Sequence, residues 1–434
     1  MNNDWITAFE ALKAVYCDDA YSNMAINEAL DRHRDCAGSF VRMFVKGVVR
    51  DTVRLDYYID RLAAKGINGI KKRTLIVLRM GIYAIRELDS VPDHAACNEA
   101  VALAKKVSKG TDRFINGMLR SYIRQRDEIE LPELDHKALD DTGLTPAQLE
   151  LCCLRYSVDR SIAELLSNQY GAREIVRIME SWSSPPSLTL RCNTARISRD
   201  ELICLLEKEG IKAWAAADSM TGIIAEGNVT TAGNLFRDGF FSIQSLSSIR
   251  SIEAFSPAEG SSVLDMCAAP GGKTAGMAEL MNNRGSIVSC ELHKHRCELI
   301  DATVRRLGID IVKSRQMDAS VFEPSFESSF DYVLCDVPCS GLGVIATKPE
   351  IKLRRPEDLK ALCDIQRSIL NNGLKYLKSG GTLMYSTCTI NRDENEHIVD
   401  AVLEKLEGYS IIEKKTFMPY NDLIGFYYCL IKKG

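Results

Sequence analysis

The sequence predicts a multidomain protein, with an all-α N-terminal region, a small α+β module and a C-terminal α/β domain built on a parallel sheet. Apolar residues recur at helical spacing over residues 1–126. After residue 236, short apolar runs alternate with helical patterns, which is typical of parallel strands joined by helices. A chain of 434 residues is long enough for two or three domains with large cores.

Residues 1–126 are predicted to be entirely helical. Six segments show helical spacing: Ala8–Tyr16, Phe40–Val49, Leu55–Leu62, Thr74–Ile85, Cys97–Val107 and Phe114–Ile123. The region carries 21 Lys and Arg against 15 Asp and Glu, a net charge of +6, although the whole chain has a net charge of −4. A basic region on an acidic protein favours a phosphate-binding face, with Lys71-Lys72-Arg73 and Lys105-Lys106 as its densest clusters. Solvated helix faces are the alternative interpretation.

The acidic stretch 127–143 is predicted to be a linker, and residues 144–235 to hold a helical segment and a small α+β module. The expected elements are helix over 144–182, a strand over Leu188–Asn193, a helix over Asp200–Glu209 and two short strands around Ala213 and Ile223. No aromatic pair in this module marks a sheet on which bases would stack.

The most informative motif lies in the domain predicted over 236–434. It reads Val263-Leu264-Asp265-Met266-Cys267-Ala268-Ala269-Pro270-Gly271-Gly272-Lys273-Thr274. An apolar run, an acid, a turn of small residues and a helical pattern predict the strand, loop and helix N-terminus that cradle a nucleotide-like ligand in a Rossmann-type sheet. A phosphate-binding loop requires glycine where Cys267 stands, and the segment lacks the Gly-x-Gly-x-x-Gly dinucleotide fingerprint. The loop therefore favours S-adenosylmethionine, and a plain glycine turn is the alternative.

Acidic residues follow four of the expected strands, namely Asp265, Glu291, Asp318 and Asp336. The carboxyl ends of parallel strands face one crevice, so these carboxylates are expected to converge on the ligand. An acid after the second strand typically accepts hydrogen bonds from ribose hydroxyls, which fits Glu291.

Two cysteines, Cys339 and Cys388, are expected at strand ends on the same edge of the sheet. A thiolate can add to C6 of a pyrimidine, which makes C5 electron-rich and able to accept a methyl group. A base must then remove the C5 proton before the thiolate leaves. None of the six histidines lies in these loops. Most of the 15 cysteines are expected to be small buried hydrophobes, Cys335 and Cys363 among them.

These motifs together resemble the Nop/Sun family of RNA cytosine-5 methyltransferases. The matching segments are Cys267–Lys273, Asp336–Ile345, Lys348–Lys352, Ser386–Cys388 and Asp393–Glu396. The resemblance implies that Cys388 attacks the base, that Cys339 assists product release and that Asp336 contacts the cytosine edge, with Lys273 beside them. It also implies that S-adenosylmethionine contacts Asp265, Cys267, Ala268, Ala269, Pro270, Gly271, Gly272, Lys273, Glu291, Asp318 and Asp336.

The N-terminal region resembles the NusB-type RNA-binding helical domain, notably in Phe114-Ile115-Asn116-Gly117-Met118-Leu119-Arg120. Arg120 therefore joins Lys71, Lys72, Arg73, Lys105 and Lys106 as candidates for RNA contact. For the small module, the family implies an incomplete ferredoxin-like or RNA-recognition fold.

The resemblance implies S-adenosylmethionine-dependent methylation of cytosine C5 in 16S ribosomal RNA. One alternative is a cytosine-5 methyltransferase for transfer RNA or DNA. DNA is a less favoured substrate, because the DNA enzymes attack with the cysteine of a Pro-Cys pair, which would be Cys339 here, and do not carry the second, Thr-Cys pattern. A second alternative is a non-catalytic RNA-binding assembly or antitermination factor, which the intact catalytic motifs argue against.

Composition limits the setting of this activity. The 15 cysteines show no Cys-x-x-Cys pair, which argues against zinc and against a disulfide framework, so we expect no metal and a reducing, cytoplasmic compartment. Residues 1–15 carry Asp4, Glu10 and Lys13, unlike a signal peptide, and no run of 18 apolar residues would span a membrane. We expect the protein to be a monomer.

Overall fold

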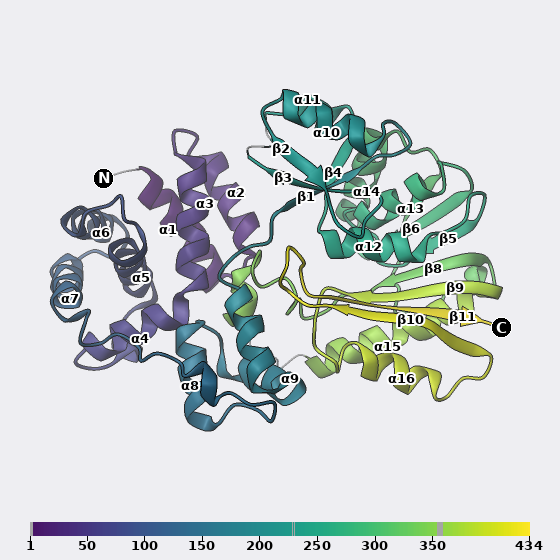
Figure 1. Cartoon of the computed structure of the whole chain (residues 1–434). Helices are drawn as coiled ribbons and strands as arrows, with labels where there is room; N and C mark the ends of the chain where they lie inside the picture. The colour runs from purple at the N-terminus through teal and green to yellow at the C-terminus, as the bar shows by residue number, and fades with distance from the viewer. Residues whose placement is uncertain (1–2, 228, 230, 354–358) are drawn as a thin grey trace. The chain divides into compact units, whose positions relative to one another are not determined.

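The computed structural model describes residues 3–227, 229, 231–353 and 359–434, which form two compact units. The first unit comprises Met1–Ser184 and Ile345–Pro356, and the second comprises Pro185–Val344 and Glu357–Gly434. The first unit is helical, whereas the second contains both sheets (Figure 1). This arrangement confirms the predicted fold class of a helical domain, a small α+β module and a Rossmann-like domain.

The first unit contains nine described α-helices and three short 3-10 turns. They are α1 (Asn3–Cys17), α2 (Ser22–Arg32), α3 (Gly38–Arg50), α4 (Thr52–Leu62), η1 (Ile67–Gly69), α5 (Lys72–Glu87), α6 (Asp93–Val107), α7 (Asp112–Gln125), η2 (His136–Ala138), α8 (Pro146–Arg155), α9 (Arg160–Ser181) and η4 (Pro349–Leu353). All six helical segments predicted before residue 126 are confirmed. Helix α2 was not predicted, because its buried face consists of Ser22, Ala25, Ile26 and Ala29, which give too weak an apolar pattern.

The predicted linker 127–143 packs against the helices of this unit. Leu131, Leu134 and Leu139 are buried. The Glu130 carboxylate accepts hydrogen bonds from the Tyr58 hydroxyl at 2.9 Å and from Arg86 Nη1 at 2.7 Å. The following range, predicted as 144–235, spans both units, because α8 and α9 lie in the first unit.

One segment from late in the sequence completes the first unit. In η4, Glu350 accepts hydrogen bonds from the backbone nitrogen of Ser22 at 3.1 Å and from its hydroxyl at 2.8 Å. Lys352 Nζ donates to the carbonyl oxygen of Tyr156 at 2.8 Å, and burial lowers the pKa of Lys352 to about 7. Both η4 side chains are buried. The helical unit therefore depends on contacts supplied by residues more than 300 positions away from α2.

The small module consists of an antiparallel sheet of four strands in the order β2-β3-β1-β4. Its elements are β1 (Leu188–Cys192), α10 (Arg199–Lys208), β2 (Lys212–Ala215), β3 (Gly222–Glu226), α11 (Gly233–Arg237) and β4 (Phe241–Ile243). The first strand, the helix and the two short strands predicted here are confirmed. Strand β4 and helix α11 were not predicted, because segments of three and five residues are too short to show periodicity.

The larger sheet has seven strands in the order β10-β11-β9-β8-β5-β6-β7. Its elements are α12 (Leu246–Phe255), β5 (Ser262–Asp265), α13 (Gly272–Leu280), β6 (Ser286–Glu291), α14 (Lys294–Leu307), β7 (Val312–Gln316), η3 (Pro324–Phe326), β8 (Phe330–Asp336), α15 (Leu359–Tyr376), β9 (Leu377–Thr387), α16 (Glu396–Leu403), β10 (Tyr409–Phe417) and β11 (Phe426–Lys433). Strands β5 to β9 run parallel to one another, and β11 pairs antiparallel with both β9 and β10.

Helices cover both faces of this sheet, with α12, α13 and α14 on one side and α15 and α16 on the other (Figure 1). The strand order reverses between β5 and β8, which is where a sheet of this type opens its ligand crevice. None of the helices formed by the described residues is long and apolar enough to cross a membrane.

A buried ion pair fastens the small module to the larger sheet domain. Arg191 on β1 donates from Nε and Nη2 to the Glu279 carboxylate on α13, at 2.8 and 3.0 Å, and both side chains are 3% exposed. The same guanidinium donates to the Gly272 carbonyl at 2.6 Å and to the Gln244 side chain. Because a buried charge is stable only when fully paired, these contacts fix β1 against α13, which begins at the predicted ligand loop.

Candidate functional site

The predicted ligand loop connects β5 to α13. The amide of Ala268 donates to the Cys290 carbonyl at 2.9 Å, and the amide of Gly271 donates to the Ala268 carbonyl at 2.7 Å, so a tight turn carries Ala269 and the exposed Pro270. Gly271 has φ of +96° and caps α13. A Cβ at Gly271 would lie 3.2 Å from the Ile300 Cα, so glycine suits this position on both counts.

Asp265, at the end of β5, is a buried carboxylate with one free oxygen. Its Oδ2 accepts from the Thr274 hydroxyl at 2.7 Å, while Oδ1 has no hydrogen-bond partner among the described residues. Burial raises the pKa of Asp265 to about 7. An orphaned acceptor beneath a glycine-rich loop fits a ligand that brings a donor, and S-adenosylmethionine carries an ammonium group and ribose hydroxyls.

The other two acids on this side of the crevice differ in exposure. Glu291, at the end of β6, is buried, and its Oε1 accepts from the His293 amide at 3.3 Å and from Arg296 Nη1 at 3.2 Å. Arg296 also donates to the Ala269 carbonyl at 3.2 Å, so it joins Glu291 to the loop. Asp318 is exposed, and its carboxylate accepts from the amide and hydroxyl of Ser320 at 2.9 and 2.6 Å.

Lys273 and Asp336 form the ion pair at the centre of the site. Lys273 Nζ lies 2.7 Å from Asp336 Oδ2, and Asp336 Oδ1 accepts from the Ser386 hydroxyl at 2.8 Å. The ammonium lies 5.2 Å from the centre of the Phe426 ring. Burial alone would lower the pKa of Lys273, but the Asp336 carboxylate raises it above its ordinary value, so the side chain stays cationic.

The two predicted cysteines lie side by side. Cys339 Sγ is 3.2 Å from Cys388 Sγ, and both side chains are partly exposed. The hydrogen bond with Cys388 and then burial raise the pKa of Cys339 well above its ordinary value. The negative charge of a Cys388 thiolate would in turn raise the pKa of Lys273, which places that ammonium within electrostatic reach of Cys388. Cys335 and Cys363 are buried, as predicted.

Close backbone packing holds the thiol loops together. The amide of Gly343 donates to the Cys388 carbonyl at 3.1 Å, and the amide of Gly425 donates to the Gly343 carbonyl at 2.8 Å. A Cβ on Gly343 would collide with the Gly425 carbonyl oxygen, so only glycine permits this approach. Sequence reasoning missed Ser386 as the second partner of Asp336, and it missed Arg296 and Phe426, because their contacts depend on packing rather than on spacing.

The basic residues predicted to contact RNA lie on the helical unit. Lys71, Lys72 and Arg73 at the start of α5 and Lys105 and Lys106 near the end of α6 are all exposed. A hydrogen bond of 2.8 Å between the hydroxyls of Thr74 and Ser108 brings these two helix ends together.

A groove of about 370 Å³ follows α7 of the same unit and contains Arg120. It is lined by Arg113, Phe114, Gly117, Met118, Arg120, Ser121 and Arg124. The three arginines are exposed, and Phe114 is 44% exposed. Sequence reasoning missed Arg113 and Arg124, although their spacing from Arg120 on a helix, seven and four residues, was available as a signal.

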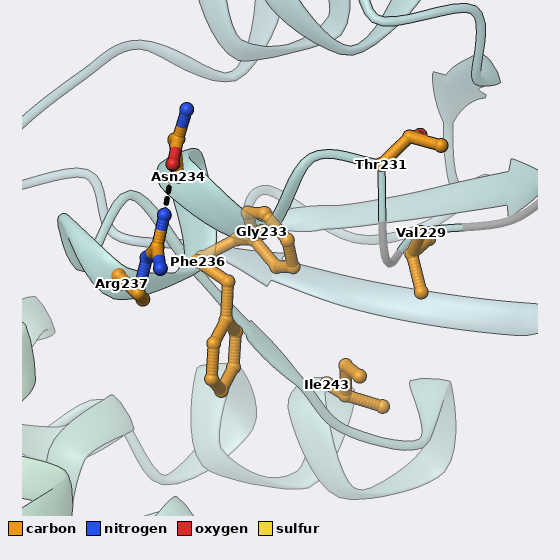
Figure 2. Close-up of a pocket in the computed structure, with 8 residues that line it drawn as sticks. Val229, Thr231, Gly233, Asn234, Phe236, Arg237 and Ile243 are labelled. Carbon is orange, nitrogen blue, oxygen red and sulfur yellow. Dashed lines mark hydrogen bonds between the residues drawn. The ribbon is translucent and has the colours of Figure 1, made fainter.

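A cavity of about 470 Å³ lies on the small module, among β4, α11 and the segment before α11. Figure 2 shows its lining, which is mostly apolar and contains none of the predicted site residues: Val229, Thr231, Gly233, Asn234, Phe236, Arg237, Phe241 and Ile243. The described part of the chain contains no group of three or more His, Cys, Asp and Glu side chains arranged to hold a metal ion.

Three protein-family models match the chain: 16S rRNA methyltransferase RsmB/F over residues 252–428, the NusB family over 3–124 and the RsmF/B-like ferredoxin-like domain over 161–231. The chain is 36% identical to the probable ribosomal RNA small subunit methyltransferase B of Bacillus subtilis, over 92% of this chain and 87% of that protein. It is 30% identical to ribosomal RNA small subunit methyltransferase B of Escherichia coli, over 89% of each. A methyltransferase homologue from Pyrococcus horikoshii is 27% identical, with a TM-score of 0.59 over 67% of this chain and 100% of that one.

The buried Glu291 carboxylate leads to a prediction about cofactor binding. If it accepts from the ribose hydroxyls, Glu291→Ala should weaken S-adenosylmethionine binding by on the order of 1.5–3 kcal/mol, because the hydroxyls lose their acceptor. Titration calorimetry measures this change. Glu298→Ala, at an exposed position on α14, serves as the control and should leave the dissociation constant unchanged. An unchanged constant for Glu291→Ala would remove this residue from the cofactor site.

Proposed function

Because the chain belongs to the RsmB/F family of 16S ribosomal RNA methyltransferases, we propose that it methylates C5 of a cytosine in 16S ribosomal RNA through a covalent cysteine–C6 adduct. Like its family, the chain uses S-adenosylmethionine. The observation that carries the proposal is the pair of thiols 3.2 Å apart on loops beside the Lys273–Asp336 ion pair.

The residues proposed to hold the cofactor surround the carboxyl ends of β5 and β6. Asp265 offers its unpaired Oδ1, Glu291 its carboxylate, and Cys267–Lys273 the tight turn at the start of α13. Asp318 and Asp336 complete the proposed set from the ends of β7 and β8. When bound, S-adenosylmethionine supplies an electrophilic methyl group.

Charge favours Cys388 as the nucleophile. The Lys273 ammonium lies within electrostatic reach of this thiol and stabilises the thiolate form, which is the reactive form. The hydrogen bond with Cys388 and then burial raise the pKa of Cys339, which disfavours the thiolate form of that thiol. This asymmetry supports, from the residues themselves, the division of roles that the family resemblance implies.

The proposed reaction forms and later breaks one bond between Cys388 Sγ and C6, and methyl transfer breaks the methyl–sulfonium bond, whose electron pair stays on the departing thioether. The Cys388 thiolate adds to C6, and the electron pair of the C5–C6 double bond forms the new bond from C5 to the transferred methyl group. Loss of the C5 proton returns an electron pair to the ring and expels Cys388 as a thiolate. Cys339 lies beside the sulfur–carbon bond that must break, which suits a role in this last step. The target base must be unpaired or flipped out for C6 to reach the thiolate.

For RNA contact, we propose a basic edge on the helical unit. It combines the α7 groove with Lys71, Lys72, Arg73, Lys105 and Lys106. Exposed arginines bind phosphates, and the exposed Phe114 ring offers a face on which a base can stack. Ribosomal RNA is the proposed partner; the thiol chemistry alone would also serve a transfer RNA.

Methylation of unmodified 16S ribosomal RNA tests the proposed activity. RNA transcribed in vitro is incubated with tritium-labelled S-adenosylmethionine and then sequenced after bisulfite treatment. We expect tritium incorporation and one cytosine that resists deamination, with neither in a Cys388→Ala control. A labelled product in which every cytosine deaminates would contradict methylation at C5, and labelling of transfer RNA alone would favour the other substrate.

The two thiols should give different products when each is replaced. Cys388→Ala should abolish turnover and leave no covalent RNA complex, because the nucleophile is gone. Cys339→Ala should permit attack and methyl transfer and then stall with RNA bonded to Cys388, since release is impaired. The stalled species should survive denaturing gel electrophoresis. If Cys388→Ala traps the RNA and Cys339→Ala does not, the two roles are reversed.

The α7 groove predicts a salt-dependent loss of RNA affinity. Replacing Arg113, Arg120 and Arg124 by glutamine should weaken RNA binding and reduce the slope of log affinity against log salt by about 2. Filter binding across a range of salt concentrations measures both. A control with the exposed Arg32, Arg34 and Arg61 replaced should keep the wild-type slope. Point variants are preferable to removal of residues 1–126, which would strip Ser22 from Glu350. An unchanged slope in the α7 variant would exclude this groove.

A further inference from the structure

Glu394, in the loop after Cys388, is a fully buried carboxylate surrounded by uncharged donors. Its Oε2 accepts from the Ser340 amide at 2.8 Å and from Gln366 Nε2 at 3.1 Å. Its Oε1 accepts from the Ser340 hydroxyl at 2.5 Å and from Asn391 Nδ2 at 3.0 Å. Four donors satisfy the four lone-pair positions of an ionised carboxylate.

These donors come from the two loops that carry the thiols. Ser340 directly follows Cys339, and its hydroxyl also lies 2.9 Å from the hydroxyl of Thr389, which directly follows Cys388. Gln366 Nε2 also donates to the carbonyl of Pro338, the residue directly before Cys339, at 2.9 Å. One carboxylate therefore holds the backbone on both sides of Cys339 and the segment that follows Cys388.

Among the described residues no cation pairs with Glu394, and burying an unpaired carboxylate is costly, so its presence at this position calls for a local reason. A neutral side chain would fill the space, but it could not accept four hydrogen bonds. The negative charge also lies close enough to Cys339 to help raise the pKa of that thiol, after Cys388 and burial. Both effects act on the cysteine that is proposed to function after methyl transfer.

We infer that Glu394 is a positioning residue, which sets the separation of Cys339 and Cys388 and holds Cys339 where it can assist release of the product. The inference rests on the proposed covalent mechanism for its role in the reaction. The separation of the two thiols can be tested without RNA.

Disulfide formation with diamide reports this separation. Two thiols lose two electrons and two protons to the azo bond of diamide, which becomes a hydrazine, and a sulfur–sulfur bond forms. Peptide mapping then follows the Cys339–Cys388 disulfide in particular. In Glu394→Gln the rate of disulfide formation should fall about tenfold, because small displacements greatly reduce the rate of oriented reactions. Glu396→Gln is the matched control, because Glu396 lies two residues away and accepts a hydrogen bond from the Thr416 hydroxyl. It should keep the wild-type rate of disulfide formation.

The same variant should also change the reaction with RNA. Glu394→Gln should accumulate RNA bonded to Cys388 on denaturing gels, whereas wild-type protein should not, because attack continues while release slows. A merely structural role would lower all activity without trapping RNA. Ser340→Ala removes one of the four donors and should give a smaller effect in both assays, and it serves if Glu394→Gln does not fold.

The two assays separate the possible failures. A folded Glu394→Gln or Ser340→Ala protein with the wild-type diamide rate would overturn the positioning role. If Cys339→Ala traps no RNA, the covalent mechanism fails and the role in product release fails with it, while the diamide comparison still decides whether Glu394 sets the thiol separation.

Discussion

The ion pair between Lys273 and Asp336 is the interaction on which the site depends. It joins the first turn of α13 to the end of β8 at 2.7 Å, across the point where the strand order reverses. Lys273 ends the proposed cofactor loop, and Asp336 accepts from the hydroxyl of Ser386, which stands two residues before Cys388. Because Asp336 keeps Lys273 cationic, one charge can orient the acid and also stabilise a Cys388 thiolate. The loss of either partner would leave the other charge half-buried and unpaired.

Buried charged groups also determine which segments meet within each of the two units. Arg191 of the small module pairs with Glu279 on α13 and donates to the Gly272 carbonyl, so the module supports the proposed cofactor loop. Glu350 and Lys352 hold η4 against the helices of the first unit through hydrogen bonds to Ser22 and Tyr156. In each case a charged side chain satisfied by hydrogen bonds fixes elements far apart in the sequence. Apolar packing supplies the cores, but these contacts specify which segments meet.

Much of the fold follows from patterns that the sequence carries locally. Helical spacing predicts α1 and α3 to α7, and apolar runs ending in acids predict β5, β6 and β8 with their order along the chain. Helix α2 escapes because its buried face is made of small and polar residues, and β4 because three residues show no period. The proposed site residues could be named from motifs, but the residues that support them could not. Ser386, Arg296 and Glu394 act through contacts between loops that are distant in the sequence, and no local spacing encodes such contacts.

RNA with 5-fluorocytosine at the target position tests most directly whether Cys388 rather than Cys339 bonds to the base. Fluorine at C5 cannot leave as a cation, so the reaction should stop after methyl transfer. The adduct is then trapped in the wild-type protein, in which neither cysteine has been replaced. Protease digestion and mass spectrometry then identify the cysteine that carries the nucleotide. The assignment of Cys388 as the nucleophile predicts a methylated fluorocytosine on the peptide that contains Cys388. The same adduct on the peptide that contains Cys339 would contradict it.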